Sequence, residues 1–164
     1  PSSILDLGTG SGAIAIALAN NLPNTQITAT DISASALKIA RKNAKAHNIN
    51  IEFIKGDLFK PVKNRKFDLI ISNPPYVSLP EYKKTSPQIK HEPKKALLAG
   101  KDGLNIIRRI LKEAPLYLKP NGILMFEIGA YQGKAALGLI PNNIFTSKKI
   151  IKDYRGLDRI LVCQ

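Results

Sequence analysis

Asn73-Pro74-Pro75-Tyr76 contains the residues of this 164-residue chain that are most directly suited to chemistry. The two prolines fix φ and remove two N–H donors, so the backbone is rigid and its carbonyls are left as acceptors. A planar amide or aryl amine has two N–H hydrogens, which the Asn73 side-chain oxygen and the Pro74 carbonyl could accept. Tyr76 could stack on that planar group, contributing on the order of 1–3 kcal/mol. We expect Asn73, Pro74 and Tyr76 to be catalytic, and the whole tetrapeptide, Pro75 included, to bind the substrate.

A glycine-rich run, Asp6-Leu7-Gly8-Thr9-Gly10-Ser11-Gly12, joins an apolar segment to a helical one near the N-terminus. Its three glycines permit a tight turn and a close approach of the backbone to a ligand. Asp31 ends the next apolar run, where a carboxylate can accept both ribose hydroxyls of an adenosine. After the third run, Asp57 could bind the adenine amine and Leu58 could pack on the ring. The expected cofactor-binding residues are Gly8, Thr9, Gly10, Ser11, Gly12, Asp31, Asp57 and Leu58.

Apolar runs rich in Ile, Leu and Val alternate with segments of helical period, which is typical of βα units around a parallel sheet. The predicted strands are Ser3–Leu7, Gln26–Asp31, Ile51–Lys55, Phe67–Ser72, Gly122–Ile128, Ser147–Asp153 and Asp158–Val162. The predicted helices are Gly12–Asn21, Ser35–His47, Leu104–Leu118 and Gln132–Leu139. The last two strands leave no room for a helix between them. We therefore expect an α/β fold with a seven-stranded, mostly parallel sheet, an antiparallel C-terminal hairpin and helices on both faces.

Three local features refine this prediction. Ser33 is expected to cap the second helix, and Pro115 to kink or shorten the third. The stretch Val77–Lys101 has little periodicity, several prolines and many lysines, which predicts a long loop with a functional role. His47 at a helix end and His91 in this loop are expected to be solvated or capping residues.

Composition limits the class of protein. A chain of 164 residues with 44% hydrophobic residues suits one domain over residues 1–164. No apolar run is long enough to cross a bilayer, so no membrane contact is expected. Cys163, the single cysteine, is expected to be a small core residue, and no cluster of Cys and His has metal-ligand spacing. An intracellular, cytoplasmic protein without a metal is the corresponding prediction.

The charge of the chain suggests a class of partner. Its formal net charge of +13 favours contact with RNA, ribosomes or acidic protein surfaces, although a solvated lysine-rich surface would give the same value. A basic flank beside the tetrapeptide could hold an acidic partner or ribosomal RNA, or be only solvated. Its members are Lys83, Lys84, Lys90, Lys94 and Lys95.

The motifs together resemble those of the class I S-adenosylmethionine-dependent methyltransferases, which have a Rossmann-like fold. Further stretches are similar to the HemK/PrmC family of release-factor glutamine methyltransferases. These are Glu92-Pro93, Ala96-Leu97, Gly100, Asp102-Gly103-Leu104 and Asp153-Tyr154-Arg155-Gly156-Leu157-Asp158-Arg159. The resemblance implies methylation of the glutamine in the Gly-Gly-Gln motif of peptide chain release factors. It also implies that S-adenosylmethionine is the cofactor, that Asn73 contacts it as well, and that Asn73–Tyr76 hold the glutamine.

One departure from that family concerns the N-terminus. Its members carry an N-terminal helical domain that helps to hold the release factor, and no segment here corresponds to it. The chain begins at Pro1, without Met and directly before an apolar run, which suggests a catalytic domain excised from a longer chain.

Two other functions remain open at this point. The tetrapeptide and the positive charge also suit a methyltransferase that acts on an exocyclic base amine of RNA or DNA, although no target-recognition segment is recognisable. Gly8, Gly10 and Ala13 fit the dinucleotide pattern Gly-x-Gly-x-x-Ala, which would suit a nicotinamide-dependent oxidoreductase or a nucleotide-binding module. The chain offers no evident partner for hydride transfer.

Overall fold

The computed structural model describes residues 2–84, 97–141 and 143–164. The chain divides into two compact units, the first of which contains Pro1–Asn73, Ala114–Met125 and Gln164. The second contains Pro74–Glu113 and Phe126–Cys163. The expectation of a single domain over residues 1–164 stays a prediction.

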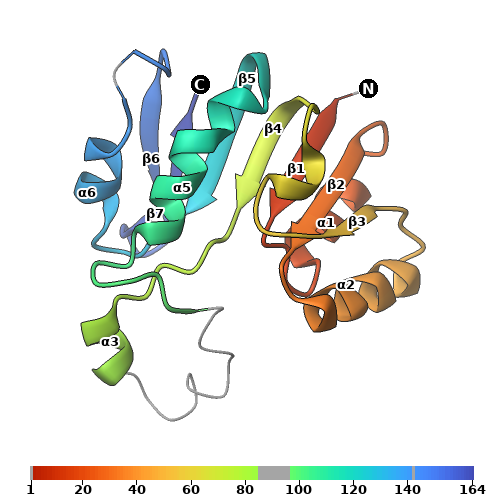
Figure 1. The fold of residues 1–164 in the computed structure, drawn as a ribbon, viewed down its shortest axis with the longest axis horizontal. Coiled ribbons are helices and arrows are strands. Elements are labelled where there is room, and N and C mark those ends of the chain that lie inside the picture. Colours follow the sequence, from red (N-terminus) through yellow and green to blue (C-terminus); the bar gives the residue numbers. More distant parts are fainter. Residues whose placement is uncertain (1, 85–96, 142) are drawn as a thin grey trace. The chain divides into compact units, whose positions relative to one another are not determined.

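The first unit holds the βα repeats near the N-terminus (Figure 1). Its elements are β1 (Ser3–Leu7), α1 (Ala13–Asn21), β2 (Gln26–Asp31), α2 (Ala34–Ala46), β3 (Glu52–Lys55), the 3₁₀ turn η1 (Lys60–Val62), β4 (Phe67–Ser72), the 3₁₀ turn η3 (Ala114–Leu116) and most of β5 (Leu118–Glu127). The second unit holds the end of β5 with α3 (Leu79–Lys84), α5 (Asn105–Glu113), α6 (Gly133–Gly138), β6 (Lys148–Lys152) and β7 (Asp158–Cys163).

The strands form one seven-stranded sheet in the order β3-β2-β1-β4-β5-β7-β6. β1 pairs in parallel with β2 and β4, and β2 pairs in parallel with β3, whereas β6 and β7 are antiparallel. This confirms the predicted sheet and its C-terminal hairpin. The winding direction reverses between β1 and β4, and in open α/β sheets ligands bind outside the carboxyl ends of the strands at such a point.

The first unit has a buried core of aliphatic and aromatic side chains. β1 is buried at four consecutive residues, Ile4–Leu7, so both faces of the sheet are covered there. One core cluster joins the first two strands to α1 and α2 and consists of Ile4, Ala15, Ile27, Ala29, Ala44 and Ile51. Alanines on the helices let them pack close to the sheet. The Ser33 side chain accepts a hydrogen bond from the Ala36 amide at 3.2 Å, which confirms the predicted cap of α2.

Two elements in the middle of the chain differ from the prediction. The third predicted helix, Leu104–Leu118, is shorter, because α5 ends at Glu113 and is followed by the 3₁₀ turn η3 around Pro115, which confirms the shortening expected at this proline. Proline lacks the N–H that an α-helix needs and clashes with the preceding turn. β5 begins at Leu118, four residues before the predicted start at Gly122.

The predicted long loop Val77–Lys101 is only partly described. It contains the short helix α3 and an isolated parallel bridge between Val77 and Leu98. Residues 85–96 lie outside the described part of the chain. The predictions for Lys90, His91, Glu92, Pro93, Lys94, Lys95 and Ala96 therefore lie outside it too.

Candidate functional site

The carboxyl ends of three neighbouring strands of the first unit, β1, β2 and β4, come into register. Leu7 of β1 pairs with Thr30 of β2 and with Ser72 of β4. The Ser72 hydroxyl also donates to the Leu7 carbonyl at 2.8 Å, which fastens the end of β4 to the end of β1. The residues that follow these pairs, Gly8 and Asn73 among them, therefore emerge at the same edge of the sheet. Sequence reasoning expected a site at this edge.

The glycine turn after β1 has a backbone that only glycine adopts readily. Gly8, Gly10 and Gly12 have φ values of 68°, 58° and 84°. A Cβ on Gly8 or Gly10 would meet no protein atom within 4 Å, so conformation rather than crowding requires glycine there. At Gly12 a Cβ would lie 3.1 Å from the Ala40 Cβ, so this glycine also lets α2 approach the turn. The turn is held from β2, because the Thr30 carbonyl accepts the amides of Gly8 and Thr9 at 2.8 and 3.0 Å.

Asp31 is held by two backbone amides of the same unit. One carboxylate oxygen accepts the Gly10 amide at 2.8 Å, and the other accepts the Ser33 amide at 2.8 Å. An ionised carboxylate has about four lone-pair positions, so each oxygen keeps the capacity to accept one more hydrogen bond. Asp31 is thus oriented for the role predicted for it, as acceptor of two hydroxyl groups.

Asp6 beneath the turn is a feature that sequence reasoning did not single out. Its side chain is buried, and the Thr9 hydroxyl donates to its Oδ2 at 2.6 Å. Burial raises the pKa of Asp6 to about 6, against which the Thr9 hydrogen bond acts only in part. Its Oδ1 is buried without a hydrogen-bond partner among the described residues. Buried acceptors are nearly always satisfied, so this atom requires an explanation.

The other predicted residues are Asp57 and Leu58 after β3 and Ser11 in the glycine turn. Leu58 has a φ of 49°, a conformation that branched side chains rarely adopt, and its carbonyl accepts the Thr30 hydroxyl at 3.3 Å. Asp57 forms an ion pair with Lys60 at 3.2 Å. The Ser11 carbonyl accepts the Asn43 side-chain amide of α2 at 2.9 Å. The contacts at Leu58 and Ser11 hold the backbone at two of the predicted cofactor-binding residues.

Asn73 directly follows β4 and is exposed. Its side chain makes no hydrogen bond with the residues that the structure describes, so its amide is available to a substrate. The roles predicted for Asn73 stay predictions.

The second unit holds Tyr76 through a network of polar side chains. The Tyr76 hydroxyl donates to Glu127 Oε1 at 3.0 Å, and Arg159 lies 3.6 Å from the same oxygen. Arg159 also pairs with Asp153 at 3.1 Å. Burial and the neighbouring Glu127 carboxylate raise the pKa of Tyr76. The phenol is therefore a neutral donor with a fixed ring, which suits stacking rather than proton transfer.

Gln132 fastens the backbone next to Tyr76, and sequence reasoning missed it. Its Nε2 donates to the carbonyls of Tyr76 at 2.9 Å and Asp102 at 3.2 Å, and its Oε1 accepts the Gly129 amide at 2.9 Å. One side chain thus joins three segments. Gly103 allows this close packing, because a Cβ there would lie 2.2 Å from the Tyr76 carbonyl oxygen. A signal was present in the sequence, since Glu127 ends β5 and Gln132 lies in the connection that follows this strand.

Other predicted residues have structural roles. Cys163 is buried, which raises its pKa to about 12 and confirms a core residue rather than a nucleophile. His47 is the exposed C-cap residue of α2, as expected. Among the described residues, no group of three or more His, Cys, Asp or Glu could hold a metal ion. In the same parts of the chain, every helix is too short or too polar to cross a bilayer.

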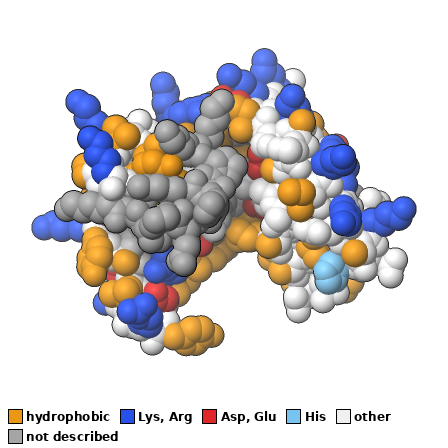
Figure 2. Space-filling view, turned by 90° about the horizontal axis from the view of Figure 1, so that it is seen from below, with side chains coloured by type: hydrophobic (Ala, Val, Ile, Leu, Met, Phe, Trp, Pro, Cys, Tyr) orange, Lys and Arg blue, Asp and Glu red, His pale blue; other side chains and the backbone are white. Residues whose placement is uncertain are grey.

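The positive charge is widely distributed. Figure 2 shows Lys and Arg side chains at many separate positions on one face of the molecule. Of the predicted basic flank, Lys83 is exposed, and the side chain of Lys84 lies outside the described part. Net charge alone therefore identifies no partner.

Solved structures show the class of fold. The 16S rRNA N2 G1207 methyltransferase from Thermus thermophilus, solved with AdoMet and guanosine, matches 99% of this chain and 37% of that one with a TM-score of 0.73 and 16% identity. At this identity the likeness concerns the fold, which is that of the class I methyltransferases.

Sequence relatives identify the family to which the chain belongs. Residues 1–100 match the methyltransferase small domain family. The chain therefore belongs to the methyltransferase small domain family. A release factor glutamine methyltransferase of Fusobacterium nucleatum is 44% identical over 99% of this chain and 47% of its own length. Another, of Geobacter sulfurreducens, is 38% identical over 98% of this chain and 57% of its own length. The chain thus spans about half the length of these curated relatives.

Proposed function

We propose that this chain transfers a methyl group from S-adenosylmethionine to the side-chain amide nitrogen of the glutamine in the Gly-Gly-Gln motif of peptide chain release factors. The observation that carries the proposal is the position of Asn73-Pro74-Pro75-Tyr76 directly after β4, where the sheet winding reverses. The names of the two relatives support the choice of substrate. Family membership argues against the nicotinamide alternative. A release factor as the substrate would place the enzyme in the cytoplasm.

The first unit offers groups that suit the proposed cofactor. Asp31 keeps two acceptor positions for the ribose hydroxyls, and Gly8 and Gly10 have no neighbouring side chain on their open side. The buried Asp6 supports the turn through its hydrogen bond with Thr9, one of the residues assigned to the cofactor. When bound, S-adenosylmethionine supplies a methyl group activated by its sulfonium. We assign its binding to Gly8–Gly12, Asp31, Asp57, Leu58 and Asn73.

The tetrapeptide would orient the nitrogen that accepts the methyl group. The Asn73 side-chain oxygen and the Pro74 carbonyl accept the two N–H groups of the glutamine amide. With both hydrogens held, the nitrogen lone pair has one direction in which to react, and this positioning lowers the barrier without a strong base. Transfer would form the N–methyl bond, break the sulfonium–methyl bond to leave a neutral thioether, and release one of the two amide protons to water. Pro75 keeps the corner rigid, and Tyr76, fixed by Glu127, stacks on the planar amide.

Methylation of a release factor tests the proposal. The chain, or its parent protein, is incubated with a release factor and labelled S-adenosylmethionine, and the Gly-Gly-Gln peptide is examined by mass spectrometry. We expect one methyl group on the glutamine, none when that glutamine is replaced by alanine, and far slower labelling with Asn73→Ala. Absence of label on the wild-type peptide would contradict the proposal. Label on a base amine of RNA or DNA would instead favour the second function left open by the sequence.

A further inference from the structure

Four cationic side chains form a row on α2 of the first unit. Their positions are i, i+3, i+4 and i+7, which places them on one side of a helix. We call this row the basic stripe, and its members are Lys38, Arg41, Lys42 and Lys45. All four are exposed, and α2 contains no acidic residue.

The basic stripe carries charge that the fold does not neutralise. Lys38, Lys42 and Lys45 form no ion pair with any residue that the structure describes. Arg41 donates to the Phe53 carbonyl at 2.9 Å, a neutral acceptor. Like charges at i, i+4 each destabilise a helix by about 0.2–0.5 kcal/mol. The stripe therefore weakens α2 slightly, and packing gives no reason for it.

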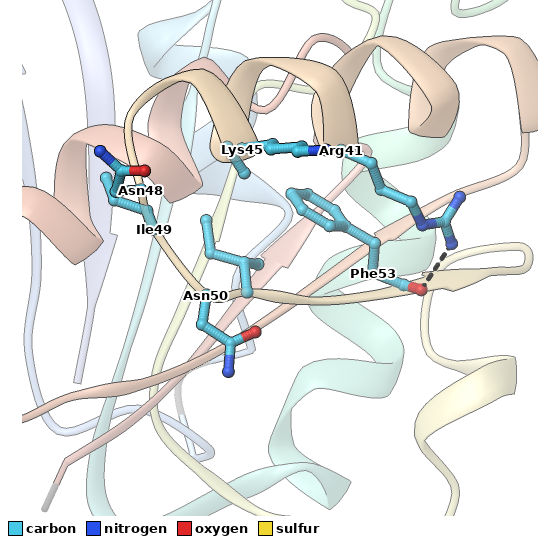
Figure 3. Close-up of a pocket in the computed structure, with 8 residues that line it drawn as sticks. Arg41, Lys45, Asn48, Ile49, Asn50 and Phe53 are labelled. Carbon is cyan, nitrogen blue, oxygen red and sulfur yellow. Dashed lines mark hydrogen bonds between the residues drawn. The ribbon is translucent and has the colours of Figure 1, made fainter.

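A pocket of about 400 Å³ adjoins the basic stripe where α2 meets β3, the edge strand of the sheet (Figure 3). Arg41 and Lys45 line it from α2, and the half-buried ring of Phe53 lines it from β3. The Arg41 guanidinium carbon lies 6.0 Å from the centre of the Phe53 ring. The exposed side chains of Asn48 and Asn50 add amide donors and acceptors. Cations, an aromatic ring and carboxamides thus lie together.

We propose that the basic stripe and this pocket bind single-stranded RNA, with the stripe on backbone phosphates and the pocket on one base. From Lys38 to Lys45 the helix rises about 10 Å, and the long side chains of its four cations extend this reach along a phosphate backbone. An acidic peptide would need only the cations. The aromatic ring and the carboxamides suit the face and edges of a base. The inference does not depend on the proposed methyl transfer.

Salt-dependent binding of a labelled single-stranded RNA tests this inference by fluorescence anisotropy. Four phosphate contacts predict that log K falls with log salt with a slope of about −3. The variant Lys38→Gln/Lys42→Gln/Lys45→Gln should bind at least tenfold more weakly, with a slope near −1. Phe53→Leu, which keeps an apolar side chain at the site, should weaken binding while leaving the slope unchanged.

A charge-matched control separates this site from general attraction to a basic protein. Lys63→Gln/Lys66→Gln/Lys134→Gln removes the same charge from exposed positions outside the basic stripe. It should bind RNA within about twofold of the wild type. Equal losses in the two triple variants would overturn the inference, as would stripe-dependent binding of polyglutamate without binding of RNA. Thermal unfolding should show the stripe variant at least as stable as the wild type, because two like-charge pairs are relieved.

Discussion

Asp6→Asn is expected to make the unliganded protein more stable at neutral pH. The side chain is buried, and burial raises the pKa of Asp6 to about 6 from an ordinary value of 3.8. The difference between these two values corresponds to about 3 kcal/mol. Asparagine keeps an oxygen that can accept the Thr9 hydroxyl, so the substitution removes mainly the buried charge.

The sign of the pH dependence follows from the raised pKa. Below pH 3.8, Asp6 is protonated in both the folded and the unfolded chain, and its contribution does not change with pH. Between 3.8 and about 6 the unfolded chain loses the proton first, so the free energy of unfolding falls. Above about pH 6 Asp6 is ionised in both states, and the free energy of unfolding falls no further on its account. The wild type should therefore lose up to about 3 kcal/mol relative to Asp6→Asn over this range.

Urea unfolding followed by circular dichroism from pH 4 to pH 8 measures this difference for both proteins. The two free energies of unfolding should converge at the acid end and separate steadily toward neutral pH. Parallel curves would refute the reasoning, because they would mean that burial of Asp6 does not penalise its charge. Calorimetry with S-adenosylmethionine adds a second readout. We expect weaker binding by the variant, since a neutral asparagine holds Thr9 of the glycine turn less strongly than the carboxylate does.

Three further substitutions test the candidate site. Asn73→Ala should lower turnover by about 10²–10³-fold while the dissociation constant for S-adenosylmethionine stays within about threefold, because the Asn73 amide mainly orients the reacting nitrogen. Steady-state kinetics and calorimetry measure the two effects, and equal losses in turnover and affinity would contradict that role. Asp31→Ala should weaken cofactor binding at least tenfold, since each hydrogen bond to a charged group contributes about 1.5–3 kcal/mol; unchanged affinity would discard the assignment. Gln132→Ala should lower the free energy of unfolding by about 1–3 kcal/mol and reduce turnover, because it leaves the Tyr76 carbonyl unpaired; urea unfolding and methyl-transfer assays would show whether both effects occur.

The parallel part of the sheet was predictable because its pattern is local. β1, β2 and β4 begin and end where the runs of apolar residues do. The boundary of α5 was harder to place, since Pro115 lies inside an apolar pattern that continues on both sides of it. The periodicity of apolar residues shows which positions are buried. The end of this helix depends instead on the N–H group that Pro115 lacks.

The residues of the candidate site likewise differ in whether the local sequence reveals them. The glycine turn and Asp31 could be identified from spacing, because parallel strands bring their carboxyl ends to one edge. Asp6 could not, since the sequence does not show that one of its oxygens lacks a partner. Gln132 was missed because two of its three hydrogen bonds reach Tyr76 and Asp102, which lie far from it in the chain.

The register at the carboxyl edge constrains how such a protein can change. Gly8 and Asn73 each follow a residue of one paired row, Leu7 with Ser72. Deleting one residue inside β1 or β4 would turn every later side chain of that strand to the opposite face. The lengths of these strands thus constrain the site as much as the identities of its residues do. Insertions in connections at the amino ends of the strands would leave the positions of the site residues unchanged. Libraries that seek new acceptors for methylation should therefore vary loops and keep strand lengths constant.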